Sequence, residues 1–282
     1  MSGPDNINKT LVIPDDDASD DGGDGTARER VTQQSFGRYE ADRILGRGAF
    51  GIVFLGYDAQ LNRRVAIKVP QLTEEGGVPA EQFLAEARQL AQLNHPGIVT
   101  VYDIGVEAGA CYIVSDYLEG VSLHHWLKAH RPNWVSSCAL TCVMADALSH
   151  AHSHRVVHRD LKPQNVILVE DLKPVIVDFG MALSEESTGG VERGMVSGTP
   201  AFMSPEQARG EGHRIDGRTD IYSLGVILYR MLTGRLPFHT RSISELLRQV
   251  REDEPQPPRQ LVPGLPRELE RICLHAMAKR LE

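Results

Sequence analysis

His158-Arg159-Asp160-Leu161-Lys162-Pro163-Gln164-Asn165 brings a carboxylate, an ammonium group and a side-chain amide together in one short stretch. That combination suits phosphoryl transfer. Asp160 can accept the proton of an attacking hydroxyl group, and Lys162 can neutralise charge on a transferring γ-phosphate. Asn165 can give an oxygen ligand to Mg²⁺. Because one octapeptide can arise by chance, this interpretation depends on whether the rest of the chain supplies the matching parts.

A glycine-rich segment lies between two expected strands. Its glycines let the backbone approach a triphosphate closely, with amide N–H groups directed at the phosphate oxygens. A dinucleotide-binding turn of the G-x-G-x-x-G type requires a helix next, whereas β-branched residues and a second strand follow here. The Gly-Lys-Ser/Thr ending of a P-loop is also missing. We therefore predict a flap over a nucleotide, formed by Gly46, Arg47, Gly48, Ala49, Phe50, Gly51, Ile52 and Val53.

Lys68 ends an alternating strand, and Glu86 lies on a helix expected to open at Pro79. On that helix Glu86 falls among the apolar positions Phe83 and Leu90, which places it on the inward face. A carboxylate buried without a cation is costly, so we predict that Lys68 is its partner. The pair would hold the lysine against the α- and β-phosphates. The alternative is that Glu86 is an ordinary helix-surface residue.

Asp178 follows the apolar strand Val175-Ile176-Val177 and precedes Phe179-Gly180. An aspartate before a glycine is also a common turn residue. Together with Asn165, however, Asp178 would complete a set of hard oxygen ligands for Mg²⁺ that is already bound to phosphates.

Composition limits the classes of protein to consider. Hydrophobic residues make up 41% and charged residues 24%, which is ordinary for a globular domain. The net charge is −8, but residues 1–30 hold eight acidic residues against three basic ones, a net −5. The remainder is near neutral and gives no support to a nucleic-acid surface or a polybasic membrane anchor. With no signal-peptide start and no apolar run of about 20 residues, we expect a cytoplasmic chain without a membrane segment.

Two residue types could indicate metal or disulfide chemistry. His150 and His154 share a helix face, but no adjacent glutamate or third ligand completes a metal site, which favours a packed helix end. Small hydrophobes in a reduced core are the better interpretation of the four cysteines, whose spacing suits neither zinc nor a disulfide framework: Cys111, Cys138, Cys142 and Cys273.

The chain divides into a tail and two structured parts. Residues 1–36 are rich in Asp, Gly and Ser and are predicted to be disordered; this acidic tail could be a substrate, a docking arm or inert. The first structured part is predicted to hold five strands and one helix, over 39–45, 52–57, 65–69, 79–93, 99–104 and 111–114. The second is predicted to be mostly helical, with helices over 135–153, 220–232, 242–252 and 267–279.

Taken together, the chain resembles protein kinases of the eukaryotic-like (Hanks-type) serine/threonine class, in its bacterial branch. The resemblance runs from about Tyr39 to the end and rests on motifs in order: Gly46–Val53, Val65–Lys68, Glu86, His158–Asn165, Asp178–Gly180, Ser204-Pro205-Glu206 and Asp220–Gly225. It implies a two-lobed α+β fold, with a small antiparallel β-sheet and one helix in the N-lobe and a mostly helical C-lobe. The implied bounds are an N-lobe over 39–114, a hinge over 115–118 and a C-lobe over 119–282.

The resemblance also implies function. It implies transfer of the γ-phosphate of ATP to serine or threonine hydroxyls of proteins, with Mg²⁺, or alternatively Mn²⁺, as the ion. Adenine would be held by Leu45, Val53, Ala66 and Ile167, and the hinge side of its site formed by Ser115, Asp116 and Leu118. A hydrophobic spine would stack Leu90, Val101, His158 and Phe179. Asp220 would pin the backbone around His158. Implied partners are protein substrates, a second copy of the chain through autophosphorylation, and a homodimer.

Two alternatives come from other classes. A pseudokinase, acting as a nucleotide-binding or scaffolding module, would be expected to lack Lys68, Asp160 or Asp178, and all three are present. A small-molecule phosphotransferase of the aminoglycoside type shares the fold. Such enzymes usually lack the Ser204-Pro205-Glu206 segment and the pattern at 220–225.

Three departures from the family pattern lead to further expectations. The gatekeeper position, usually bulkier, falls on Ser115, which predicts an open pocket behind the adenine site. Arg159 indicates switching by phosphorylation of the activation loop, yet Met195 stands where the family most often has the phosphorylated threonine. The remaining candidates, with constitutive activity as the alternative, are Ser184, Ser187, Thr188 and Ser197. The family's fold continues beyond Glu282 and supplies an arginine to the glutamate matching Glu206, so we expect a truncated end and Glu206 without that partner.

Overall fold

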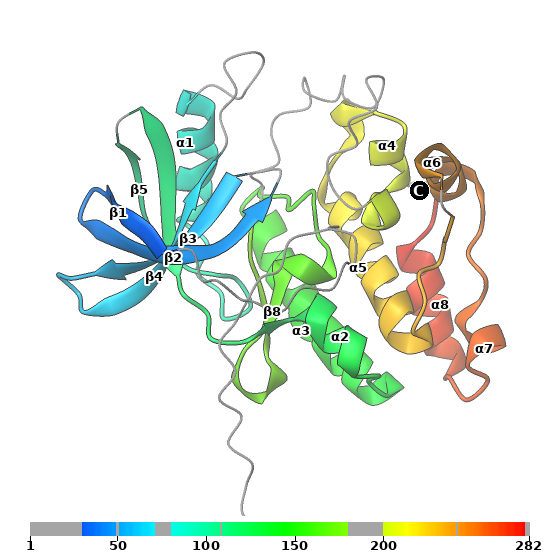
Figure 1. Cartoon of the computed structure of the whole chain (residues 1–282). Coiled ribbons are helices and arrows are strands. Elements are labelled where there is room, and N and C mark those ends of the chain that lie inside the picture. Colours follow the sequence, from blue (N-terminus) through cyan, green and yellow to red (C-terminus); the bar gives the residue numbers. More distant parts are fainter. Residues whose placement is uncertain are drawn as a thin grey trace, which may run out of the picture.

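The computed structural model describes residues 30–48, 51–70, 80–107, 109–179, 200–240 and 242–279. It has two lobes: a β-sheet with one helix, and a larger part built mainly of helices (Figure 1). The two-lobed α+β fold expected from the sequence is therefore confirmed.

The N-lobe is a six-stranded antiparallel sheet in the order β1-β2-β3-β4-β6-β5. Helix α1 (Ala80–Leu90) packs on β5 and β6 through a small apolar cluster that includes Phe83, Ala87 and Ile113. The strands are β1 (Arg30–Phe36), β2 (Tyr39–Gly48), β3 (Gly51–Asp58), β4 (Arg63–Val69), β5 (Val101–Glu107) and β6 (Ala110–Asp116).

Strand β1 corrects the prediction that residues 1–36 are disordered throughout. Arg30–Phe36 pairs with β2 across a tight turn in which Gly37 has a φ of +58°, a value that glycine adopts without strain. Phe36 is buried and its ring lies 5.5 Å from that of Phe54 and 5.6 Å from that of Tyr112. The average composition of the tail hid this strand, because the aspartates and most of the glycines lie before Arg30. Residues 1–29 lie outside the described residues.

The C-lobe combines a small sheet with helices. Strands β7 (Val121–Ser122), β8 (Val166–Leu168) and β9 (Pro174–Ile176) pair in antiparallel fashion. The loop that carries Asp160 leads into β8. The helices are α2 (Leu123–Ala129), α3 (Trp134–Ser153), α4 (Pro205–Ala208), α5 (Gly217–Thr233), α6 (Ile243–Glu252), α7 (Pro258–Leu261) and α8 (Arg267–Ala276). Single 3₁₀ turns occupy 163–165, 170–172, 200–202 and 212–214.

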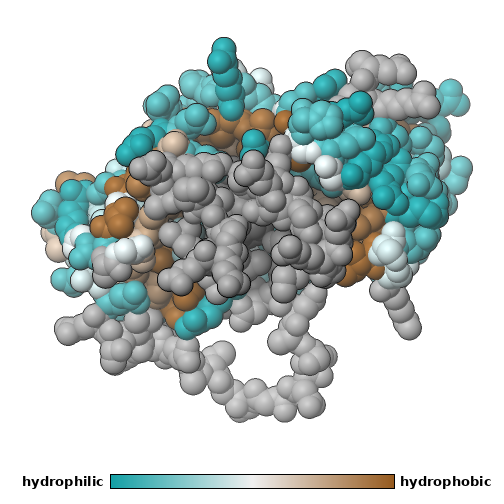
Figure 2. Space-filling model, turned by 90° about the horizontal axis from the view of Figure 1, so that it is seen from above, coloured by the Kyte–Doolittle hydropathy of each residue, from teal (hydrophilic) through white to brown (hydrophobic). Residues whose placement is uncertain are grey.

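Helix α5 is the centre of the C-lobe and packs against α3 and α8. The Asp216 side chain caps its first turn, and Gly234, with a φ of +73°, ends it in the left-handed conformation. Seen from above, the outer surface of the C-lobe is mostly hydrophilic (Figure 2). Within the described ranges, none of the helices combines the length and the apolarity that a bilayer span requires.

Candidate active site

The loop between α3 and β8 carries Asp160, and a buried carboxylate fixes its start. Asp220, on α5, accepts hydrogen bonds from the backbone N–H groups of His158 at 2.8 Å and Arg159 at 2.9 Å. The ring of His152 contacts the same carboxylate at 2.8 Å. Arg159 has a φ of +66°, which costs energy for a residue other than glycine. The anchoring by Asp220 holds that conformation in place, as the resemblance implied.

Three polar side chains of the loop lie together. Lys162 Nζ is 3.1 Å from Asp160 Oδ2. Asn165 donates its side-chain N–H to the backbone carbonyl of Asp160 at 2.9 Å, with Asp160 Oδ2 also within 3.4 Å of the same nitrogen. With its nitrogen directed at Asp160, Asn165 has its side-chain oxygen to offer a cation. The geometry thus brings Asp160, Lys162 and Asn165 together.

Asp178 joins the two lobes through an ion pair. Its Oδ1 lies 2.9 Å from Nζ of Lys68 on β4, although the residues are 110 positions apart in sequence. Burial alone would raise the pKa of Asp178, but the positive charge of Lys68, with a smaller effect from Lys162, holds the pKa below its usual range. Asp178 therefore stays a carboxylate, the form that binds a divalent cation. Its φ of +61° is again left-handed.

Lys68 was expected to pair with Glu86, and the ion pair described for it is with Asp178. Glu86 is half-buried on α1, in the turn between the buried residues Phe83 and Leu90. Its inward placement agrees with the sequence argument. The pairing of Lys68 with Glu86 stays a prediction.

An apolar cavity opens between the lobes beside this ion pair. The four residues expected to hold adenine all line it: Leu45, Val53, Ala66 and Ile167. Its hinge side is formed by Ser115, Asp116, Tyr117 and Leu118, of which Tyr117 was not predicted. The lining also includes a group of mostly apolar residues: Leu90, Leu93, Ile98, Val99, Val101, Ile113 and Phe179. Its lining is suited to a flat, largely apolar ring system with one polar edge.

The glycine-rich segment includes the end of β2 and the start of β3. Gly48 pairs with Gly51, and Gly51 has a φ of +124°. A Cβ atom at Gly51 would lie 2.1 Å from the carbonyl oxygen of Val69, so the backbones approach too closely for any other residue. Among the described residues of this segment, Val53 lines the cavity, whereas Gly46, Arg47, Gly51 and Ile52 do not. Ala49 and Phe50 lie outside the described residues.

The spine residues lie in one continuous region. Leu90, Val101 and Phe179 line the same cavity, and the ring of His158 lies 4.8 Å from that of Phe179. His158 Nδ1 accepts from the backbone N–H of Asp160, so its proton is on Nε2, which donates to the carbonyl of Val177 at 3.0 Å. His158 therefore ties the loop of Asp160 to the strand that presents Asp178.

The segment around Glu206 shows two contacts that sequence reasoning missed. Glu206 is buried and accepts a hydrogen bond from the Thr219 hydroxyl at 2.5 Å, so it has a partner from α5. Gln207 closes a capping box with Ser204 and donates to the carbonyl of Arg159 at 2.6 Å. A Ser-x-x-Gln pattern in the sequence is the signal that could have located this helix start.

The predictions for the histidines near the end of α3 and for the phosphorylation sites have different outcomes. The rings of His150 and His154 lie 4.5 Å apart, and those of His95 and His150 lie 5.3 Å apart, which agrees with a packed helix end. The candidate phosphorylation sites all lie outside the described residues: Ser184, Ser187, Thr188 and Ser197.

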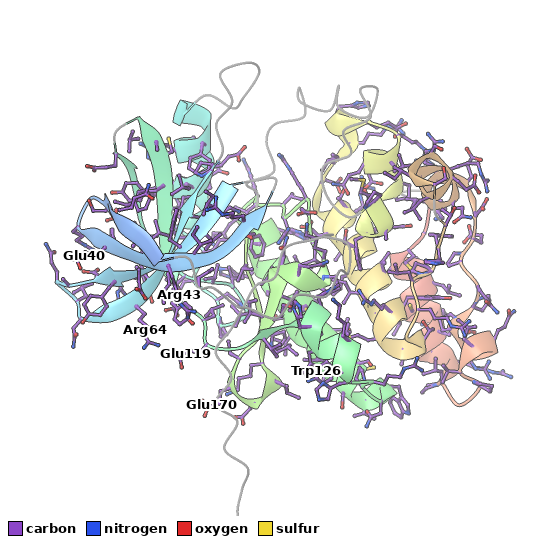
Figure 3. The ribbon with its side chains drawn as sticks, in the orientation of Figure 1. Glu40, Arg43, Arg64, Glu119, Trp126 and Glu170 are labelled. Carbon is purple, nitrogen blue, oxygen red and sulfur yellow. The ribbon has the colours of Figure 1, made fainter. Side chains whose placement is uncertain are left out.

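The hinge side of the site also carries an exposed ion pair. Arg64, at the start of β4, lies 3.1 Å from Glu119, which follows the hinge, and the two side chains meet between the lobes (Figure 3). An exposed pair of this kind contributes little to stability. It marks the side of the molecule on which the chain passes from one lobe to the other.

Comparisons with known proteins show the family of the chain. The family model described as "Protein kinase domain" matches residues 39–280. The chain is 35% identical over 262 residues to serine/threonine-protein kinase Pkn1 of Myxococcus xanthus, covering 87% of the chain and 36% of that protein. It is 36% identical over 247 residues to PrkC of Bacillus subtilis, covering 86% and 38%. For PknB of Mycobacterium tuberculosis the identity is 38% over 257 residues, covering 87% and 40%.

The chain thus spans less than half the length of each of these relatives. The family match itself extends over both lobes and over every part of the site described above. The chain belongs to the protein kinase family, and it is similar to the serine/threonine kinases of bacteria.

Proposed function

We propose that this chain transfers the γ-phosphate of Mg-ATP to serine and threonine hydroxyls of proteins. The observation that carries the proposal is the convergence of Asp160, Lys162 and Asn165 with the Lys68–Asp178 pair beside the apolar cavity. Lys162 lies near enough to Asp178 to lower its pKa, so the two groups of charges belong to one site.

The residues fit a magnesium ion. Asp178 is held as a carboxylate and Asn165 has its amide oxygen available, and hard oxygen ligands of this kind suit Mg²⁺, with Mn²⁺ as the alternative. When bound, the ion would neutralise charge on the phosphates. Among the described residues there is no cluster of three His, Cys, Asp or Glu side chains suited to a metal. A two-ligand site of this type is completed by the phosphates of the nucleotide.

The chain's own groups then have separate roles. The apolar walls hold adenine, and Lys68 places an ammonium group where the nucleotide phosphates would enter. Asp160 orients the acceptor hydroxyl and takes its proton, and Lys162, 3.1 Å away, stabilises the charge that moves with the phosphoryl group. Asp220 keeps this loop in its left-handed turn, so that the groups need not reorganise during the reaction.

The acceptor class is inferred from the relatives. The three similar proteins named above are serine/threonine kinases. We further infer autophosphorylation in trans at one or more of Ser184, Ser187, Thr188 and Ser197. Arg159 would pair with such a phosphate.

The test measures transfer of labelled γ-phosphate from ATP with Mg²⁺, followed by mass spectrometry of the phosphorylated residues. Asp160→Asn should lower transfer by about 10²- to 10⁴-fold, the usual contribution of a general base. Asp171→Asn, an exposed aspartate on a nearby turn, is the matched control and should keep full activity. Label on a small hydroxyl compound, with none on protein, would contradict the proposal, as would tight ATP binding without any transfer.

A further inference from the structure

A second cavity lies where α2 and α5 end, and its lining shares no residue with the active-site cavity. It has a volume of about 330 Å³. The end of α2 and the connection to α3 form one wall, through residues 127–132. Arg230, Met231 and Gly234 at the end of α5 form the other. Trp126, labelled in Figure 3, lies on α2 one residue before this wall and its ring stacks on His130 at 4.9 Å.

The lining is basic. It contains Lys128, Arg131 and Arg230, together with His130, and no aspartate or glutamate. Over the ranges that the structure describes, none of these three cations has a carboxylate within 4.0 Å. Burial lowers the pKa of Arg230, whose guanidinium is partly removed from water. Three positive charges therefore border one cavity without described counter-charges, an arrangement that an anion would stabilise.

Helix ends explain only part of this arrangement. Lys128 and Arg230 each lie in the last turn of a helix, where the helix dipole favours a cation. Arg131 lies beyond the end of α2, so the helix dipole does not explain a positive charge at this position. Its guanidinium lies against Gly234, where a Cβ atom would come within 2.9 Å of Arg131 Cζ. The absence of a side chain at Gly234 thus gives Arg131 room at the cavity.

The chain contains a segment of complementary charge. Residues 15–24 hold six aspartates and no basic residue, which makes this segment the most acidic stretch of the sequence: Asp15, Asp16, Asp17, Asp20, Asp21 and Asp24. All six carboxylates are ionised at neutral pH. An extended chain covers at most about 3.3–3.6 Å per residue, so the 15 residues from Asp15 to Glu29 give a reach of roughly 50 Å from the start of β1.

We propose that the basic cavity binds the aspartate-rich segment 15–24 of this chain's own N-terminal tail. Carboxylates of the segment would pair with Lys128, Arg131 and Arg230. The planar guanidinium group of each arginine offers two parallel N–H donors to a carboxylate. The tail is then a docking arm on the C-lobe, in a cavity whose lining shares no residue with the active-site cavity. The proposal does not depend on kinase activity and is tested without nucleotide.

The first test measures the reactivity of lysine side chains in the full chain. Limited acetylation is quantified at Lys128 and at the exposed Lys173, for the wild type and for a variant with all six aspartates changed to asparagine. Lys128 should react about threefold or more slowly in the wild type, and this protection should disappear in 1 M salt, because exposed charge pairs are screened. Lys173, whose side chain is 67% exposed on another turn, should react equally in both. Equal reactivity of Lys128 in the two chains overturns the proposal.

The second test is zero-length carbodiimide cross-linking with mass spectrometry. Cross-links between Lys128 and residues 15–24 should fall by about fivefold or more in Arg131→Gln, because removing one of three charges weakens the pairing. Arg235→Gln, an exposed arginine outside the lining, is the matched control. A mixture of isotopically light and heavy chains separates docking within one chain from docking between two copies. Cross-links spread equally over Lys128 and Lys173 contradict the proposal.

Discussion

At the scale of single residues, the site combines polar side chains on one loop with two residues, Arg159 and Asp178, in a left-handed backbone conformation. The sequence placed Asp160, Lys162 and Asn165 on one loop, and the structure brings their side chains together. It did not indicate that Arg159 and Asp178 take left-handed φ values of +66° and +61°. Residues other than glycine adopt this conformation where tertiary contacts impose it. At Arg159 the contact is the Asp220 carboxylate, which accepts from its backbone N–H. Because Asp220 is distant in sequence, no local pattern encodes this contact.

Ser115, which lines the cavity, is predicted to set how far it extends behind the adenine site. It lies opposite Ala66 on β4 and Val101 on β5, at the boundary between the hinge wall and the deeper apolar lining. We expect Ser115→Met to fill that boundary and weaken binding of a bulky, back-extended ATP-competitive inhibitor by about tenfold or more, a loss of about 1.4 kcal/mol. The affinity is measured by displacement of a fluorescent nucleotide.

The matched control is Ser115→Ala, which keeps the space open and should keep the inhibitor's affinity. ATP itself should bind all three proteins similarly, because its adenine does not reach the deeper part. Unchanged inhibitor affinity in Ser115→Met would show that the deeper lining is not used.

At the scale of elements, hydrophobic periodicity predicted the long helices within a few residues. The helix expected over 135–153 is α3 (Trp134–Ser153), and that expected over 220–232 is α5 (Gly217–Thr233). The start of α5 was placed late because its first turn is identified by the Asp216 cap and not by apolar residues. The last predicted helix ends earlier, at Ala276. Strand β1 was missed because its pairing partner, and not its composition, makes it a strand.

The contribution of β1 can be measured through Phe36. Its side chain is 2% exposed and packs on Phe54 and Tyr112. We expect Phe36→Ala to lower the free energy of unfolding by about 3–5 kcal/mol, the usual range for a buried phenylalanine. Gln34→Ala on the exposed part of the same strand should change it by about 0.5 kcal/mol or less. Urea unfolding distinguishes the two; equal, small effects would mean that β1 contributes nothing to the core.

Helix α1 should contribute to catalysis through Glu86. If Asp178 binds a metal ion during the reaction, Lys68 needs another carboxylate, and half-buried Glu86 faces the core of the same lobe. We expect Glu86→Gln to lower kcat by about 10- to 100-fold, or roughly 1.4–2.7 kcal/mol, with little change in thermal stability. Gln89→Ala, on the exposed side of α1, is the control. A kcat equal to that of the wild type would contradict a role of Glu86 in catalysis.

At the scale of the whole molecule, the site is formed where the two lobes meet. Lys68 belongs to the N-lobe sheet and Asp178 to the end of a C-lobe strand, and the cavity takes its walls from both. Sequence order can predict that each lobe forms, since each has its own periodic pattern. The relative position of the lobes depends on contacts such as Lys68–Asp178, which join residues 110 positions apart. The relative position of the lobes was predicted from the resemblance to a known family, and local sequence patterns could not predict it.

A ligand that bridges the lobes should therefore stabilise both of them. At a concentration about 100 times its dissociation constant, a ligand that binds only the native state adds about 2.7 kcal/mol of stability. For a domain of this size each kcal/mol raises Tm by about 2–4 °C, so Mg-ATP should raise Tm by roughly 5–10 °C. The shift is measured by calorimetry with ATP and Mg²⁺, and with ATP and a chelator. Asp178→Asn should lose the part of the shift that depends on the ion, whereas the control Asp171→Asn should keep it. An ion-dependent shift that survives in Asp178→Asn would mean that the metal is held by other groups.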